Sequence, residues 1–186
     1  MEKNLNRKLP LDSLLNRIDA HRRKVCESIV KDFDYKFNNF PGGLKKHQNW
    51  VGGYKDHVEE TMNIAVVLYE NLNEKRRLDF TLSQVLFCTF LHDFDKLLRF
   101  EKKGNKFIKK DSYHSGFVNT IADLLKDKYK YKLSSEEINA IKYTHGEGKD
   151  FHPTKRIMKP LATLVHCADA ISARIWFNKG RNDKSW

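Results

Sequence analysis

The chain has 186 residues, of which 40% are hydrophobic, and this length suits one domain with a core of its own. Its longest strongly apolar stretch, VLFCTFL, is far shorter than the roughly 20 residues that span a bilayer, and the N-terminus lacks the apolar segment of a signal peptide. We therefore expect a cytoplasmic protein with no membrane partner.

The formal net charge of +11 favours phosphate-bearing partners, because a basic surface attracts polyanions over a long range. A nucleic acid is one such partner, and a nucleotide or another phosphate ester is the other. The lysines are scattered in short runs, so a solvated surface is the competing interpretation of the same charge.

Apolar residues recur at helical spacing along most of the chain, which predicts an all-α bundle. The segment FEKKGNKFIKK alternates around Gly104 and Asn105 and predicts a short β-hairpin inserted on the surface. Ser134 and Glu137 form a capping box, and Pro160 suits the first turn of a helix. Six helices are expected. The first spans about 11–33 behind a capping Asp12, and the third begins near 81 and includes 88–100. The others span about 54–72, 115–126 and 134–143, and the last begins at 160.

The stretch CTFLHDFDKLLRF places charged and ionisable side chains in an apolar helix. On a helical period, Asp93 shares a face with Leu86 and Phe90, while His92 shares one with Val85. Both side chains should therefore point inward. A carboxylate removed from water normally pairs, protonates or binds a metal ion.

Four more residues are candidate partners for this pair. His57 and Asp169 lie on partly apolar helix faces, and His114 and His145 lie where helices begin or end. Each has a structural explanation of its own. The alternative for His57 is a core histidine, and that for Asp169 is a carboxylate paired with Arg174 or Lys96. His114 and His145 would then serve only at the ends of helices.

Taken together, imidazoles and carboxylates on separate segments favour a divalent metal ion. Manganese, iron, cobalt, nickel and zinc suit this donor set, and magnesium is a further candidate. Because no cysteine pair accompanies the histidines, a closed structural zinc site is disfavoured.

The order His57, then His92 and Asp93, then Asp169 resembles the H...HD...D signature of the HD-domain metal-dependent phosphohydrolases. HQNWVGGYKDHVEETMNIA is similar to the HHxxPGGLLEHTLxVA segment of the HD domains of bacterial 3' to 5' exoribonucleases. FLHDFDKL resembles LLHDIGKL, and LATLVHCADAISAR resembles LALLLHYADNLDA. The similarity covers about 44–174, and its fragments occur in the family's order.

The resemblance implies a catalytic metal centre. His57, His92, Asp93 and Asp169 would hold one ion, and His114 and His145, with Asp93 bridging, match the ligands of a second ion in two-metal members. Such ions activate water for attack on phosphate, with Asp93 as a central group. Lys96 matches the lysine of HDxxK and would neutralise a phosphate oxygen.

Some positions depart from the family pattern. THG stands where two-metal members often have HHG, so a second metal site would be one histidine ligand short. Glu147 or water would be needed to complete it. One bound ion and two bound ions therefore remain alternatives. Asp95 replaces a usual glycine beside the site. His47 and Arg174 lie near motif residues and are candidates for substrate binding, with a supporting or structural role as the alternative.

The resemblance divides the chain into an N-terminal helix packing on the domain (1–43), an HD phosphohydrolase domain (44–177) and a basic C-terminal tail (178–186). We expect hydrolysis of a nucleotide, a mono- or triphosphate that includes deoxynucleotides. The alternatives are a 3'-5' exonuclease, a phosphodiesterase acting on single-stranded nucleic acid or a cyclic nucleotide, and a non-enzymatic basic protein that binds nucleic acid.

Overall fold

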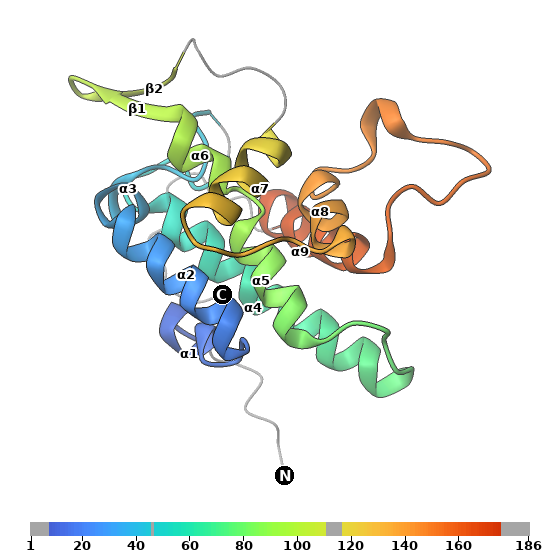
Figure 1. The fold of residues 1–186 in the computed structure, drawn as a ribbon. Coiled ribbons are helices and arrows are strands. Elements are labelled where there is room, and N and C mark those ends of the chain that lie inside the picture. Colours follow the sequence, from blue (N-terminus) through green and yellow to red (C-terminus); the bar gives the residue numbers. More distant parts are fainter. Residues whose placement is uncertain (1–7, 46, 111–116, 176–186) are drawn as a thin grey trace.

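The computed structural model describes residues 8–45, 47–110 and 117–175, and this part of the chain forms a helical bundle with one two-stranded hairpin (Figure 1). The expected all-α fold with a short hairpin insertion is confirmed. The helices are α1 (Leu11–Leu15), α2 (Ala20–Asp32), α3 (Asp34–Asn39), α4 (Gly53–Lys75), α5 (Leu82–Leu91), α6 (Phe94–Arg99), α7 (Phe117–Asp127), α8 (Ser135–Lys142) and α9 (Pro160–Arg174), with a short 3₁₀ turn at Gly148–Asp150.

The hairpin consists of β1 (Phe100–Lys103) and β2 (Lys106–Lys109) and projects from the end of α6 (Figure 1). The strands are antiparallel, and Lys103 pairs with Lys106 across a two-residue loop. Gly104 has a φ of 57°, which a glycine adopts without steric cost. The ring of Phe107 lies 5.1 Å from that of Phe40, so the hairpin is anchored to the bundle.

The single helix expected from 11 to 33 is divided in two. The Asp19 side chain accepts a hydrogen bond from the backbone N–H of Arg22 at 3.1 Å, which begins a new helix at Ala20. The expected cap Asp12 lies inside α1, which begins after Pro10. Local capping at Asp19 thus interrupts a hydrophobic repeat that looks continuous in the sequence.

Helix α4 packs against α1, α3, α5 and α9. Leu14, Ile29 and Phe37 of the N-terminal helices are buried in one apolar cluster with Met62 of α4 and Phe90 of α5. A second apolar cluster joins α4 and α5 to α8 and α9. Because α4 and α5 contribute to both clusters, residues far apart in the sequence are brought to the same part of the bundle.

The junction of α5 and α6 positions two consecutive polar residues. Helix α5 ends at Leu91 and α6 begins at Phe94, with Asp93 at φ −116° and ψ 16°. In an unbroken helix, neighbouring side chains point about 100° apart. The interruption allows His92 and Asp93 both to be fully buried. The continuous helix expected here is therefore replaced by two helices that meet at the polar pair.

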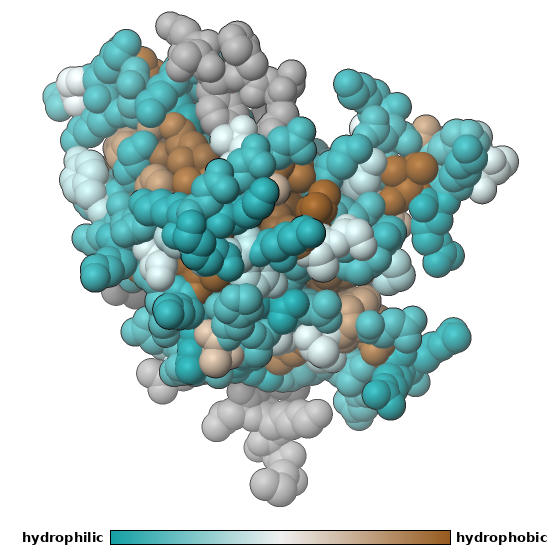
Figure 2. Space-filling view, viewed as in Figure 1, coloured by the Kyte–Doolittle hydropathy of each residue, from teal (hydrophilic) through white to brown (hydrophobic). Residues whose placement is uncertain are grey.

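The face of the molecule shown in Figure 2 is mainly hydrophilic, with small areas of hydrophobic colour between the polar residues. Within the described ranges, we find no helix with the length and hydropathy needed to cross a bilayer.

Candidate metal centre

Side chains from three parts of the bundle converge at one buried point. His57 comes from α4, His92 and Asp93 from the junction of α5 and α6, and Asp169 from α9. The Nε2 atoms of His57 and His92 lie 3.1 Å apart. His57 Nε2 lies 3.2 Å from Asp93 Oδ2 and 3.3 Å from Asp169 Oδ1. His92 Nε2 lies 3.3 and 3.6 Å from the same two oxygens.

The two imidazole rings turn the same nitrogen toward this point. His92 Nδ1 lies 2.6 Å from the backbone carbonyl oxygen of Thr89, which can only accept a hydrogen bond, so Nδ1 carries the proton. The Nδ1 atom of His57 faces the Ser172 hydroxyl at 3.1 Å. Each ring is therefore held by its outer nitrogen, which leaves Nε2 directed at the carboxylates.

These distances fit the donor atoms of one cation. Neighbouring donors around an ion with bonds of about 2.0–2.2 Å are separated by about 3.0–3.5 Å. His57, His92 and Asp169 each offer a donor atom within 4.8 Å of the others. Asp93 Oδ1 and Asp169 Oδ1 are buried with no hydrogen-bond partner among the described residues. A divalent ion would satisfy both oxygens and the facing imidazole nitrogens.

The electrostatics of the cluster also favour a cation. Burial alone would lower the pKa of His92, but the charges of Asp93 and Asp169 outweigh it and raise that pKa to about 10. Burial would raise the pKa of each carboxyl group, yet Lys96 and His92 hold the pKa of Asp93 well below its usual value. The pKa of Asp169 is also lowered, against burial, by the nearby imidazoles of His57 and His92. Both carboxylates are therefore ionised at neutral pH.

Lys96 is part of this cluster. Its buried ammonium group donates a hydrogen bond to Asp93 Oδ2. The neighbouring Asp95 is also buried and lies 2.9 Å from Arg99 Nε through its Oδ2. Burial, followed by the charge of Asp93, raises the pKa of Asp95 to about 6. Asp95 thus places a second carboxyl group beside the metal candidates, as its sequence position suggested.

His145 lies on the solvent side of the same cluster. Its side chain is 55% exposed, and its Nε2 lies 3.6 Å from Asp93 Oδ1 and 3.8 Å from Asp169 Oδ2. The nearby carboxylate of Asp93 raises the pKa of His145. Asp93 therefore presents Oδ2 to the inner histidines and Oδ1 toward His145. The other expected ligand on this side, His114, lies outside the described residues.

Thr144 and Glu147, on either side of His145, both make hydrogen bonds with the backbone. Thr144 donates from its hydroxyl to the Ala140 carbonyl at 2.9 Å. The Glu147 carboxylate accepts from the backbone N–H of Met158 at 2.7 Å. One oxygen of this carboxylate thus holds the loop before α9, and the completion of a second metal site by Glu147 or water stays a prediction.

The two expected substrate-binding residues differ in their placement. The His47 ring lies 4.8 Å from the His57 ring, and its Nε2 is buried without a hydrogen-bond partner among the described residues. Burial, together with the charges of His57 and Lys96, lowers the pKa of His47 to about 4. Arg174 is exposed near the end of α9 and makes no hydrogen bond or ion pair with a described residue. The structure thus brings His47 to the candidate centre, and the role of Arg174 in substrate binding stays a prediction.

Three polar residues that the sequence did not single out support His57. Ser172, Glu60 and Gln48 form a connected group behind its ring. A signal for two of them exists, since Glu60 follows His57 by three residues and Ser172 follows Asp169 by three, a spacing that shares a helix face. Gln48 is in a loop with a φ of 44°, and no periodicity predicts its contact.

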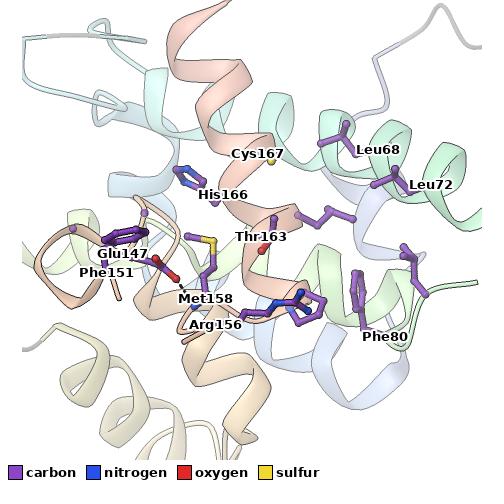
Figure 3. Close-up of a pocket in the computed structure, with 15 residues that line it drawn as sticks. Leu68, Leu72, Phe80, Glu147, Phe151, Arg156, Met158, Thr163, His166 and Cys167 are labelled. Atoms are coloured by element: carbon purple, nitrogen blue, oxygen red, sulfur yellow. Dashed lines mark hydrogen bonds between the residues drawn. The ribbon is translucent and has the colours of Figure 1, made fainter. Parts of the chain in front are cut away.

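A separate cavity of about 790 Å³ lies beyond the His145 loop. Leu68 and Leu72 of α4 form one wall, His166 and Cys167 of α9 another, and Phe151 lies on the side opposite the two leucines (Figure 3). None of the proposed inner ligands, His57, His92, Asp93 and Asp169, lines this cavity. His166, which lines the cavity, is fixed by its Nδ1, 2.6 Å from the Thr144 carbonyl oxygen.

Comparison with known proteins agrees with the geometry. The chain is similar to the 3'-5' exoribonuclease YhaM of Bacillus pumilus, with 22% identity over 161 residues that cover 82% of this chain and 48% of the relative. The YhaM of Listeria welshimeri is 20% identical over 165 residues, covering 84% of this chain and 50% of the relative. The chain therefore spans about half the length of the curated relatives it matches. No solved structure matches it.

The sequence model of the HD domain matches residues 54–174. This range begins just before His57, includes His92 and Asp93, and extends past Asp169. The match supports the enzyme class expected from the sequence, a metal-dependent phosphohydrolase. The resemblance found in the motifs is thus confirmed, and the chain belongs to the HD domain family.

Proposed function

We propose that this chain is a divalent-metal-dependent phosphohydrolase that cleaves the phosphate ester of a nucleotide. The observation that carries the proposal is the pair of imidazole Nε2 atoms 3.1 Å apart, flanked by carboxylate oxygens of Asp93 and Asp169. A set of two imidazole nitrogens and two buried carboxylates is typical of the ligands of a divalent transition-metal ion.

The proposed ligands of the inner ion are His57, His92, Asp93 and Asp169. His145 and Asp93 Oδ1 lie on the solvent side, where a second ion or a substrate would be reached. Manganese, iron, cobalt, nickel, zinc and magnesium remain the candidate ions. A bound divalent ion supplies a Lewis acid that lowers the pKa of water and offsets charge on phosphate oxygens.

The residues of the chain supply the rest of the proposed chemistry. Lys96 keeps Asp93 ionised and carries a positive charge within the site that can serve a phosphate oxygen. The low pKa of His47 keeps its imidazole neutral at neutral pH, so its free Nε2 can accept or donate a hydrogen bond to substrate. The half-exposed ring of His145 lies where a substrate would enter.

A nucleotide is our preferred substrate, as a mono- or triphosphate, in the cytoplasm. The scattered positive charge of the chain supports a small phosphate ester over a polymer. The second candidate is a 3'-5' exonuclease, and the observation that favours it is the similarity to the 3'-5' exoribonuclease YhaM. Only half of their length is matched here, so that activity is itself a proposal for this chain.

The test is a phosphate-release assay over nucleoside mono-, di- and triphosphates with each candidate ion, beside a labelled single-stranded RNA. Each reaction is run at about 50 and 200 mM salt, because a protein that contacts many phosphates loses orders of magnitude in affinity over this range. We expect metal-dependent release from a nucleotide with a shallow salt dependence. Rapid, salt-sensitive degradation of the RNA with intact nucleotides would select the exonuclease instead, and no hydrolysis with any ion would reject both.

A further inference from the structure

Behind His57, on the side away from the carboxylates, a chain of hydrogen bonds leads to Glu60. His57 Nδ1 lies 3.1 Å from the Ser172 hydroxyl oxygen. The Ser172 hydroxyl donates to Glu60 Oε1 at 2.6 Å. The side-chain amide of Gln48 donates to the same Glu60 oxygen at 2.9 Å and lies 3.4 Å from the Ser172 oxygen.

The direction of each hydrogen bond follows from the chemistry of the groups. A carboxylate only accepts, so the single hydroxyl proton of Ser172 is committed to Glu60. The serine oxygen then has only lone pairs to offer to His57. The Nδ1 atom of His57 must therefore carry the ring proton, which leaves the Nε2 lone pair free at the metal centre.

We propose that Glu60 is a positioning residue that acts through Ser172 to hold His57 in the tautomer that binds the metal ion. This inference rests on the proposed function, since it concerns the same centre. Glu60 touches neither the substrate nor the proposed ion. Its effect is transmitted by the serine hydroxyl, so Ser172 and Glu60 form one unit.

The charge of Glu60 is essential to this role. A serine hydroxyl can also turn and donate its proton to an unprotonated Nδ1, which would place the ring proton on Nε2 and block the ligand atom. The carboxylate prevents that rotation by offering the stronger acceptor. Ser172 and Gln48 are both buried and Glu60 is partly buried, so the serine hydroxyl itself is shielded from bulk water.

The experiment measures metal affinity by calorimetry in the full chain for wild type, Glu60→Gln, Ser172→Ala and the double variant. Groups that orient a metal-binding histidine typically contribute about 10- to 100-fold in metal affinity. We expect each single variant to bind zinc about 10- to 100-fold more weakly. Because the two residues act in series, the double variant should lose no more zinc affinity than the single variant that binds zinc more weakly.

Glu59→Gln is the matched control. Glu59 is the preceding residue of α4, and it accepts from the Leu11 backbone N–H at 3.2 Å instead of facing the centre. This variant should bind zinc as wild type does. Thermal unfolding in the presence of a chelator checks that all variants fold, so that loss of affinity is not mistaken for loss of structure.

A second readout observes the tautomer directly. Nitrogen-15 NMR of the His57 ring, in protein treated with a chelator, should show Nδ1 protonated in wild type and a larger Nε2-protonated fraction in Glu60→Gln. Unchanged zinc affinity and an unchanged tautomer in Glu60→Gln would overturn the proposal. If wild type bound no metal, the proposed function would fail, and the tautomer in Glu60→Gln would still decide whether Glu60 positions His57.

Discussion

The ammonium group of Lys96 donates to Asp93 Oδ2, the same carboxylate oxygen that lies 3.2 Å from His57 Nε2. One anionic oxygen thus serves both a fixed protein cation and the proposed metal centre. Lys96 is buried within this arrangement. Lysines are rarely buried without a partner, and Asp93 is the partner here. Its position suggests a role for charge in the site beyond holding Asp93.

We expect Lys96→Met to retain metal and to lose turnover. Removing a positive charge beside Asp93 does not weaken cation binding, whereas losing one group that stabilises developing charge typically costs about 10²- to 10³-fold in rate. Elemental analysis and the phosphate-release assay would be run on the same sample. Lys103→Met, on the exposed hairpin, is the control and should behave as wild type. Loss of bound metal in Lys96→Met would assign Lys96 to the structure of the site.

Removal of one carboxylate should abolish metal binding. We expect Asp169→Asn to bind no ion at concentrations that saturate wild type, because the neutral amide weakens the field at both histidines. A ligand at 100 times its dissociation constant stabilises the folded state by about 2.7 kcal/mol. Added manganese should therefore raise the melting temperature of wild type and leave that of Asp169→Asn unchanged.

The control for that experiment is Asp150→Asn. Asp150 pairs with Lys142 at 2.8 Å on the surface, away from the centre, so this variant should keep the manganese response. An equal rise in melting temperature for Asp169→Asn and wild type would show that the ion binds elsewhere.

Glu137 should make stability depend on pH in the acid range. This buried carboxylate accepts hydrogen bonds from Arg22 Nε and the Tyr131 hydroxyl, each at 2.8 Å. Burial alone would raise its pKa, but its hydrogen bonds with Ser134, Arg22 and Tyr131 lower the pKa below the ordinary 4.5. The Glu137 side chain therefore takes up a proton at a higher pH in the unfolded chain than in the folded chain. The stability that the ionised carboxylate contributes is present above the ordinary pKa and is lost as the pH falls through the lower pKa of the folded chain.

Urea unfolding at pH 7, 5, 4 and 3 would measure this effect. Glu137→Gln should be less stable than wild type at pH 7, and its free energy of unfolding should fall less steeply below about pH 5. Glu136→Gln, at an exposed neighbour paired with Lys159, is the control. The same steep acid dependence in wild type and Glu137→Gln would refute the assignment.

The packing of the N-terminal helices can be tested at Leu14. This side chain is fully buried in the cluster that includes α4 and α5. Leu14→Ala should destabilise the protein by about 2–5 kcal/mol, the usual cost for a buried leucine. Leu72→Ala, at a half-exposed site on α4, should cost much less.

One cooperative transition is expected for both leucine variants, because α1 shares its core with α4. The proposed division into 1–43, 44–177 and 178–186 remains a prediction, and this experiment tests its first boundary. A separate early transition in Leu14→Ala would show that the N-terminal part unfolds as a unit of its own.

Local signals predicted much of the fold. The Ser134 and Glu137 capping box begins α8, Pro160 begins α9, and the Gly104 loop closes the hairpin. The division of the first helix at Asp19 was not predicted, because hydrophobic periodicity continues across it. The break between His92 and Asp93 was missed for the same reason, since both sides of the junction are apolar.

The sequence by itself determined the fold class, the family and the residue types of the centre, because these depend on periodicity and on motifs that are local in the chain. Only the tertiary structure decided which atoms meet. His57 and His92 are 35 residues apart, and Glu60 and Ser172 are 112 apart, yet each pair is in contact. Such contacts depend on how α4 packs against α5 and α9, and long-range packing leaves no signal in the spacing of any single helix.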